Sequence, residues 1–122
     1  MRNTKDLDDM ACPEKYRKMG DFIDYLSGKK IAPILTLVIG GNHEASKFFS
    51  DLYYGGWLCS NIYYMGRSGV INFGPLRIMG ISGIHNAKYA QCGYFEKYPY
   101  SHSDKKSIYC TREYEIAKCG LY

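Results

Sequence analysis

An apolar run that ends in two glycines and three polar residues constrains the fold more than any other feature. Residues 34–39 are mostly apolar and rich in β-branched side chains, and residues 40–41 are both glycine. A short run of this kind, bounded by breakers, predicts a central strand buried on both faces, as in an open α/β sheet. Glycine permits the sharp turn that follows. Residues 42–44, Asn-His-Glu, are therefore expected at the carboxyl end of that strand, where open α/β sheets bind ligands.

Two interpretations of this polar triplet stay open on these residues alone. Asn42, His43 and Glu44 offer an amide oxygen, an imidazole and a carboxylate, which are groups suited to metal binding and to acid–base chemistry. Alternatively, the triplet is a polar turn before a helix, with Glu44 favoured by the dipole at the helix N-terminus. The first interpretation predicts a functional site and the second only a local cap.

Composition sets broad limits on the class of protein. The 122 residues suffice for one small domain, and 46% hydrophobic with 23% charged residues is ordinary for a globular chain. The net charge of +4 is compatible with a nucleic-acid partner, and the 13 tyrosines offer flat stacking faces. Five cysteines without a C-x-x-C spacing argue against a disulfide framework and a zinc ribbon, and predict reduced thiols inside a cell. We see no leader and no apolar run of membrane-spanning length, so neither secretion nor a membrane span is expected.

Three stretches show helical periodicity, at residues 12–28, 44–52 and 104–118. Gly28 is the expected stop of the first, and Asp104 the expected cap of the third. The first stretch has an apolar stripe at spacings of three and four, formed by Tyr16, Met19, Phe22, Ile23 and Leu26. The second has the apolar residues Phe48, Phe49 and Leu52, and in the third Ile108, Arg112, Ile116 and Cys119 recur on one face. Cys110 is expected to be a small buried apolar residue rather than a nucleophile.

The middle of the chain predicts strands. Residues 53–60 are expected to form a glycine-broken aromatic loop, followed by strands at 62–65, 70–73 and 76–81. Gly74 and Pro75 mark a turn between the last two strands, so a hairpin is expected. Arg67 and Arg77 are expected to point outward into solvent.

Residues 84–103 break the periodicity and interleave aromatic with basic side chains. Such a segment suits unstacked RNA, with bases on the rings and phosphates on the lysines. The alternative is an ordinary mobile loop whose aromatics pack on the domain. Tyr54 and Trp57 leave a similar choice, because they either cover a sheet edge or stack a nucleobase.

The Gly-Asn-His-Glu tetrad at 41–44 resembles the central signature of the calcineurin-like metallophosphoesterases. Six longer stretches, in one order and spacing, resemble the RNA lariat debranching enzymes of that superfamily, which hydrolyse the 2′–5′ phosphodiester of excised intron lariats. These stretches are residues 13–17, 32–36, 40–46, 54–57, 61–66 and 80–84. The resemblance covers nearly the whole chain but only the middle of such an enzyme.

The resemblance implies a fold and a chemistry. Residues 1–122 would be the central part of one calcineurin-like phosphoesterase domain, an α/β fold that is a partial αββα sandwich lacking N- and C-terminal elements. Asn42 would be a metal ligand, His43 the catalytic residue facing the phosphate, and 84–103 the lariat-recognition loop. The implied substrate contacts are Tyr54, Trp57, His85, Tyr94, Tyr98, Tyr100 and Arg112. The implied cofactors are divalent ions (Fe²⁺, Zn²⁺ or Mn²⁺), the implied partner is branched lariat RNA, and the implied location is the nucleus, with the cytoplasm as a second.

Most ligands of the family's two-metal centre are nevertheless missing from these residues. There is no Asp-x-His pair and no Gly-His-x-His, and Arg2 and Asn3 resemble only the trailing edge of a second metal motif. Several converging ligands are needed to hold an ion, so the isolated chain is expected to be inactive. Two alternatives remain open: a metallophosphoesterase with another substrate, and a non-catalytic RNA-binding remnant.

Overall fold

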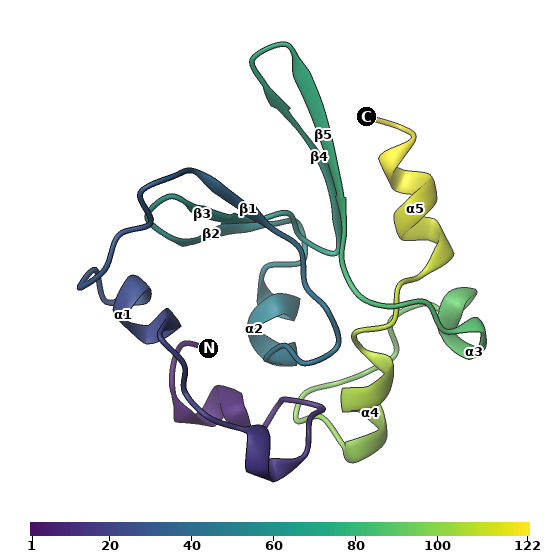
Figure 1. Ribbon diagram of the computed structural model, residues 1–122. Helices are drawn as coiled ribbons and strands as arrows, with labels where there is room; N and C mark the ends of the chain where they lie inside the picture. The colour runs from purple at the N-terminus through teal and green to yellow at the C-terminus, as the bar shows by residue number, and fades with distance from the viewer.

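Two small sheets organise the chain in the computed structural model, which describes residues 1–122 (Figure 1). The first has three strands in the order β1 (Thr36–Val38), β3 (Ile62–Tyr64), β2 (Gly56–Cys59). In it β1 is parallel and β2 antiparallel to β3. The second sheet is an antiparallel hairpin of β4 (Ser68–Phe73) and β5 (Leu76–Ile81). The fold is therefore mixed α/β.

Short helices surround the two sheets. In Figure 1, α1 and α2 lie on one side of the three-stranded sheet, and α5 runs beside the hairpin. The α-helices are α1 (Phe22–Leu26), α2 (Ser46–Asp51), α3 (Ala87–Ala90), α4 (His102–Ser107) and α5 (Glu113–Cys119), and the 3₁₀ turns are η1 (Thr4–Leu7) and η2 (Glu14–Tyr16). None of these helices is long and apolar enough to cross a membrane.

The apolar core lies between α2 and the three-stranded sheet. Phe48 on α2 is buried against Leu58 and Tyr64 of the sheet. The ring of Phe49 meets that of Tyr64 edge to face, with 4.3 Å between the centroids. The helix predicted over 44–52 is thus confirmed, although it begins two residues later, because its aromatic face is the one that the sheet buries.

The apolar run before the glycines differs most from its prediction. Only Thr36–Val38 forms a strand, and β1 lies at the edge of its sheet rather than at the centre. Ile34 is 74% exposed, and Ile39 is exposed as well. The prediction of a central strand buried on both faces was wrong, since β1 pairs with β3 alone at the sheet edge and none of its three residues is fully buried.

The long helix predicted over 12–28 is replaced by two short turns, η2 and α1. Gly20 lies between them, and glycine is among the poorest helix formers. Gly28 does end α1, with φ of +80°, as predicted. Tyr16 is exposed, so the expected apolar stripe does not form one buried face.

The helix predicted over 104–118 is also divided, into α4 and α5. Between them Cys110 forms a β-bridge with Ile84, and the Thr111 amide donates to the Ile84 carbonyl at 3.0 Å. This pairing draws the backbone out of the helical conformation. Ser101, not Asp104, is the cap of α4, and Asp104 closes the capping box three residues later.

The strands of the central region were predicted best. The three segments at 62–65, 70–73 and 76–81 are confirmed as β3, β4 and β5, with a turn at 74–75. The aromatic loop at 53–60 is corrected, because Gly56–Cys59 is strand β2. The irregular segment 84–103 is corrected too, since it contains α3 and the start of α4.

The two arginines of this region behave differently. Arg77 is exposed, as predicted. Arg67 is buried: its Nη2 donates to Ser50 Oγ at 3.0 Å, and its guanidinium lies over the Tyr94 ring at 4.9 Å. The prediction that Arg67 is solvated was wrong because strand alternation does not show which residues another segment will cover. Cys110 is buried, as expected, and all five cysteines are free thiols.

A buried carboxylate joins α5 to the hairpin. Glu115 accepts hydrogen bonds from Ser68 Oγ at 2.5 Å and from the Tyr53 hydroxyl, and pairs with Lys118 Nζ at 2.8 Å. Burial acts to raise the pKa of Glu115, but the hydrogen bonds from Lys118, Ser68 and Tyr53 outweigh it and lower that pKa below its ordinary value of 4.5. The folded state therefore favours the ionised carboxylate.

This carboxylate predicts a loss of stability in acid. Its contribution to the free energy of unfolding is full above pH 4.5 and is lost as the pH falls through the lower pKa of the folded state. The Glu115→Gln variant should be less stable than the parent chain at neutral pH and should lose less stability on acidification. Urea unfolding at neutral pH and at about pH 3 measures both effects. Glu113→Gln, an exposed neighbour, should keep the parent's acid dependence, and an equal dependence in both variants would contradict the role of Glu115.

Candidate functional site

The turn between β1 and α2 contains the polar triplet, and residues after β5 hold it in place. The Gly40 amide donates to Ser82 Oγ at 3.0 Å, and the Gly40 carbonyl accepts from the Gly83 amide at 2.8 Å. Ser82 Oγ in turn donates to the Gly66 carbonyl at 2.6 Å. The turn is thereby tied to the segments that precede β4 and follow β5.

Gly83 must be glycine for this contact to form. Its φ is +97°, and a Cβ atom there would lie 2.0 Å from the Tyr109 carbonyl oxygen. Only glycine adopts that conformation and permits the close approach.

Within the turn the three polar side chains have different surroundings. Glu44 Oε1 accepts a hydrogen bond from the Gly41 amide at 3.1 Å, so its carboxylate closes the turn, while the N-cap of α2 is Ala45 and has no side-chain cap. His43 is exposed and Asn42 is half-buried. Asn42 and His43 are therefore the side chains that remain for a ligand.

An apolar cavity of about 340 Å³ opens beside this turn, between α1, α2 and the three-stranded sheet. His43 and Glu44 line it together with mainly hydrophobic side chains, among them Phe22, Phe48 and Leu58. The imidazole of His43 thus lies between solvent and the apolar cavity.

These residues do not form a metal centre by themselves. No group of three or more His, Cys, Asp or Glu side chains lies close enough together to hold an ion. Glu44 is the acidic residue of the turn, and it already binds the Gly41 amide. The chain therefore does not fit a two-metal centre without ligands from elsewhere.

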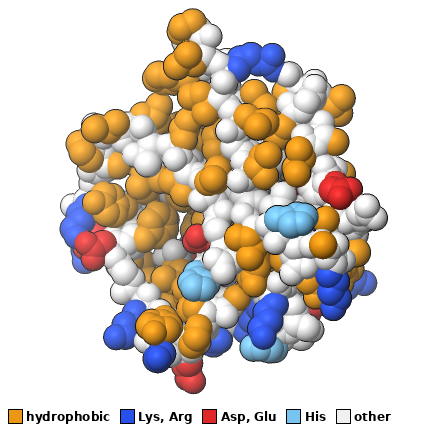
Figure 2. Space-filling view, turned by 45° about the vertical axis from the view of Figure 1, so that its right-hand side comes forward, with side chains coloured by type: hydrophobic (Ala, Val, Ile, Leu, Met, Phe, Trp, Pro, Cys, Tyr) orange, Lys and Arg blue, Asp and Glu red, His pale blue; other side chains and the backbone are white.

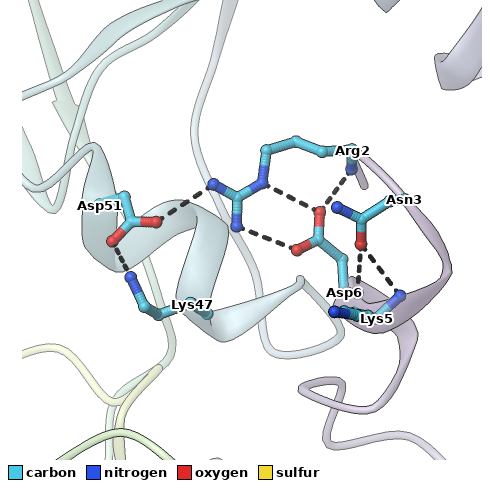
Figure 3. A network of polar contacts seen from close by, with 6 residues as sticks. All are labelled: Arg2, Asn3, Lys5, Asp6, Lys47 and Asp51. Carbon is cyan, nitrogen blue, oxygen red and sulfur yellow. Dashed lines mark hydrogen bonds and ion pairs between the residues drawn. The ribbon is translucent and has the colours of Figure 1, made fainter.

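The N-terminal segment packs against the helix that follows the turn. Arg2 pairs with Asp6 at 3.0 Å and with Asp51 of α2 at 3.1 Å, and Lys47 pairs with the same Asp51 (Figure 3). Asn3 caps η1 by accepting from the amides that follow it. Arg2 and Asn3, which resemble the edge of a metal motif, therefore lie close to α2, where they stabilise local structure.

The predicted substrate residues divide into an outer and an inner group. Tyr54, Trp57, His85 and Tyr98 are exposed, and Tyr100 is half-buried with its ring edge to face on Tyr98 at 5.5 Å. Trp57 also packs on Tyr63, with 5.2 Å between the centroids. These outer side chains are open to a partner.

Tyr94 and Arg112 form the inner group. The centroid of the Tyr94 ring lies 4.9 Å from Arg67 Cζ and 4.6 Å from Arg112 Cζ, and burial raises the pKa of Tyr94 to about 12. Arg112 has 0% of its surface exposed. Arg112 therefore presents no free face to a substrate, whereas Tyr94 is half-buried.

Sequence reasoning missed one side chain near the turn. Lys47 lies on α2, four residues after His43, and its Nζ lies 5.5 Å from the centroid of the Tyr98 ring. The position of Lys47 in the helix predicted over 44–52, shortly after the polar triplet, was the available signal, but the contact with Tyr98 required the tertiary structure. In Figure 2 hydrophobic side chains cover the upper part of the face shown, and most of the visible Lys and Arg side chains gather below.

Comparison with known proteins supports the resemblance. The chain is 49% identical over 118 residues to a lariat debranching enzyme of Arabidopsis thaliana, covering 97% of this chain and 28% of that protein. It is 51% identical to the enzyme of Schizosaccharomyces pombe (95% and 25%) and 51% identical to that of Homo sapiens (97% and 22%). No family model matches the chain. The chain thus spans about a quarter of the length of these curated relatives.

The Ser82 hydrogen bonds that clamp the turn between β1 and α2 predict a specific loss of stability. Ser82→Ala removes both hydrogen bonds of a buried hydroxyl and leaves the Gly40 amide without its partner, so the free energy of unfolding should fall by about 1–3 kcal/mol. Ser60→Ala, at an exposed turn, should change it by less than about 0.5 kcal/mol. Urea unfolding of both variants makes the comparison, and equal values would refute the clamp.

Proposed function

We propose that this chain is the central part of a lariat debranching enzyme, a metal-dependent hydrolase of the 2′–5′ phosphodiester in branched intron RNA, and that it works in the nucleus. The observation that carries the proposal is the identity of about one half over nearly the whole chain with proteins of that name. The matched region includes the Gly-Asn-His-Glu turn at the end of β1. The proposed complete fold is the αββα sandwich, of which the two small sheets here are a part.

In this proposal Asn42 and His43 have different roles. The neutral amide oxygen of Asn42 is a metal ligand, and the exposed imidazole of His43 faces the substrate phosphate as a hydrogen-bond donor. The remaining ligands for Fe²⁺, Zn²⁺ or Mn²⁺ come from parts of the longer protein that these residues do not include. The bound ions supply Lewis-acid chemistry at the phosphate.

The outer aromatic side chains are proposed to bind the RNA. Lys47, four residues after His43 in the chain, lies beside Tyr98, and the two pair a stacking ring with a cation that can meet a phosphate. Tyr54, Trp57, His85 and Tyr100 extend this surface. The segment 84–103 is proposed as the lariat-recognition segment.

A second candidate is an RNA-binding remnant without catalysis. The lack of any three-ligand group within the chain favours it for the isolated 122 residues. A metallophosphoesterase with another substrate is the weaker alternative, because the matched proteins are named for lariat debranching. The two experiments that follow separate these possibilities.

The first experiment concerns RNA binding by the outer surface. Tyr98→Ala should weaken binding of a 2′–5′ branched RNA by about 1–3 kcal/mol, because a ring that stacks on a base is lost. Fluorescence anisotropy at fixed salt measures the affinity. Phe73→Ala is the matched control, since Phe73 is 56% exposed and Tyr98 57% exposed, and Phe73 lies at the end of the hairpin. Equal affinities for the two variants would refute a stacking role for Tyr98.

The second experiment concerns catalysis. The isolated chain with Mn²⁺, Zn²⁺ or Fe²⁺ should not cleave branched RNA, whereas a chimera that carries it in place of the matched segment of the Schizosaccharomyces pombe enzyme should. In the chimera, His43→Ala should lower kcat with metal affinity retained, and Asn42→Ala should lower both. A folded chimera without activity would contradict the proposed function. Cleavage by the isolated chain that His43→Ala abolishes would contradict the need for outside ligands.

A further inference from the structure

Residues 93–100 adopt their conformation without any backbone-to-backbone hydrogen bond. They connect α3 to α4, and neither their amides nor their carbonyls take part in such a bond. A segment of this kind is held only by what its side chains contact. The side chains that point inward from it therefore decide where its outer side chains lie.

The main contact between this segment and the protein interior is a buried ion pair. Arg112 Nη2 lies 2.8 Å from Glu96 Oε1, and both side chains are 0% exposed. Ser107 Oγ donates to the same Glu96 oxygen at 2.5 Å, and Arg112 Nη1 donates to the Tyr89 carbonyl at 3.2 Å. One guanidinium thus links the start of α5 both to α3 and to the middle of residues 93–100.

Aromatic rings complete the surroundings of this guanidinium. Arg112 Cζ lies 4.6 Å from the centroid of Tyr94, 5.5 Å from that of Tyr89 and 5.9 Å from that of Phe95. A planar guanidinium can stack on rings and bind a carboxylate at the same time, which an ammonium group does poorly. Arg112 therefore organises residues 89–96 from within.

The residues that follow Glu96 point outward. Lys97 and Tyr98 are exposed, and the Tyr98 ring reaches Lys47 on α2. Because only Lys97 separates Glu96 from Tyr98 in the chain, the position of the Glu96 carboxylate limits where this ring can lie.

We propose that the Arg112–Glu96 ion pair positions Tyr98 beside α2 for RNA binding, so that Arg112 acts through Glu96 and not by touching the substrate. This role rests on the proposed function, since it assumes that Tyr98 contacts branched RNA. It replaces the expectation from sequence that Arg112 is itself a substrate contact.

Glu96→Gln is the variant that tests this role. Removing Arg112 would leave the buried Glu96 carboxylate without a counter-charge, whereas Glu96→Gln leaves the buried Arg112 guanidinium a carbonyl acceptor in place of its counter-charge. Glutamine keeps the size of Glu96 and a carbonyl acceptor but removes the charge. The matched control is Glu113→Gln, because Glu113 is exposed on α5 and its replacement raises the net charge by the same amount. Circular dichroism and thermal melting verify that both variants fold.

The two variants should differ in affinity for a 2′–5′ branched RNA. Glu96→Gln should bind about fivefold more weakly than the parent chain, because a buried ion pair is replaced by a weaker hydrogen bond from the charged guanidinium to a neutral amide. Glu113→Gln should bind equally well or slightly better, because the chain becomes more positive. In the Tyr98→Ala background Glu96→Gln should have little further effect, since both changes act on one contact.

Limited trypsin digestion of the free protein provides a second measurement. Cleavage after Lys97 should be several-fold faster in Glu96→Gln than in Glu113→Gln, because the segment opens more often. Cleavage after Lys29 should be the same in both. These rates do not depend on RNA and report the ion pair by itself.

The outcomes separate this inference from the function on which it rests. If the parent chain binds branched RNA and Glu96→Gln binds as well as Glu113→Gln, the positioning role is overturned and the proposed function stands. If Glu96→Gln weakens binding equally with and without Tyr98, the role of Tyr98 as its target is overturned. If the parent chain does not bind branched RNA, the proposed function and the positioning role fail together, whatever the cleavage rates.

Discussion

Hydrogen bonds at Ser82 and Gly83 join the turn after β1 to the rest of the molecule. Ser82 Oγ binds the Gly40 amide and the Gly66 carbonyl, while the Gly83 amide binds the Gly40 carbonyl. The Ser82 carbonyl accepts from Thr111 Oγ1 at 2.9 Å. The turn with Asn42 and His43, the hairpin and the segment before α5 therefore share one junction, and the position of each depends on the other two.

Arg112 comes directly after Thr111 in the chain and extends the contacts of this junction to residues 84–103. The bridge between Ile84 and Cys110 brings α5 to the start of that segment, and Arg112 then meets Glu96 and Tyr94 inside it. Because the apolar core is a small cluster around Phe48 and Tyr64, buried polar contacts define much of this half of the molecule. A continuous line of contacts thus runs from the candidate catalytic turn to the candidate RNA surface.

Several elements could be predicted from the sequence because their causes are local. The hairpin follows from two β-rich runs around Gly74 and Pro75, and α2 follows from its aromatic stripe. The break of the last helix could not be predicted, because Thr111 and Cys110 leave the helical conformation to pair with Ile84, which is distant in sequence. The periodicity of that stretch is compatible both with one continuous helix and with two shorter helices.

The features of the candidate site likewise divide into those that the sequence predicts and those that only the tertiary structure shows. The Gly-Gly turn and the polar triplet at 42–44 follow from the sequence by itself, because glycine conformation and residue type are properties of the local chain. Only the tertiary structure decided that Arg67 and Arg112 are buried, that β1 is an edge strand and that Lys47 meets Tyr98. Burial and contact depend on which distant segment covers a residue, and no local sequence pattern shows which segment that is.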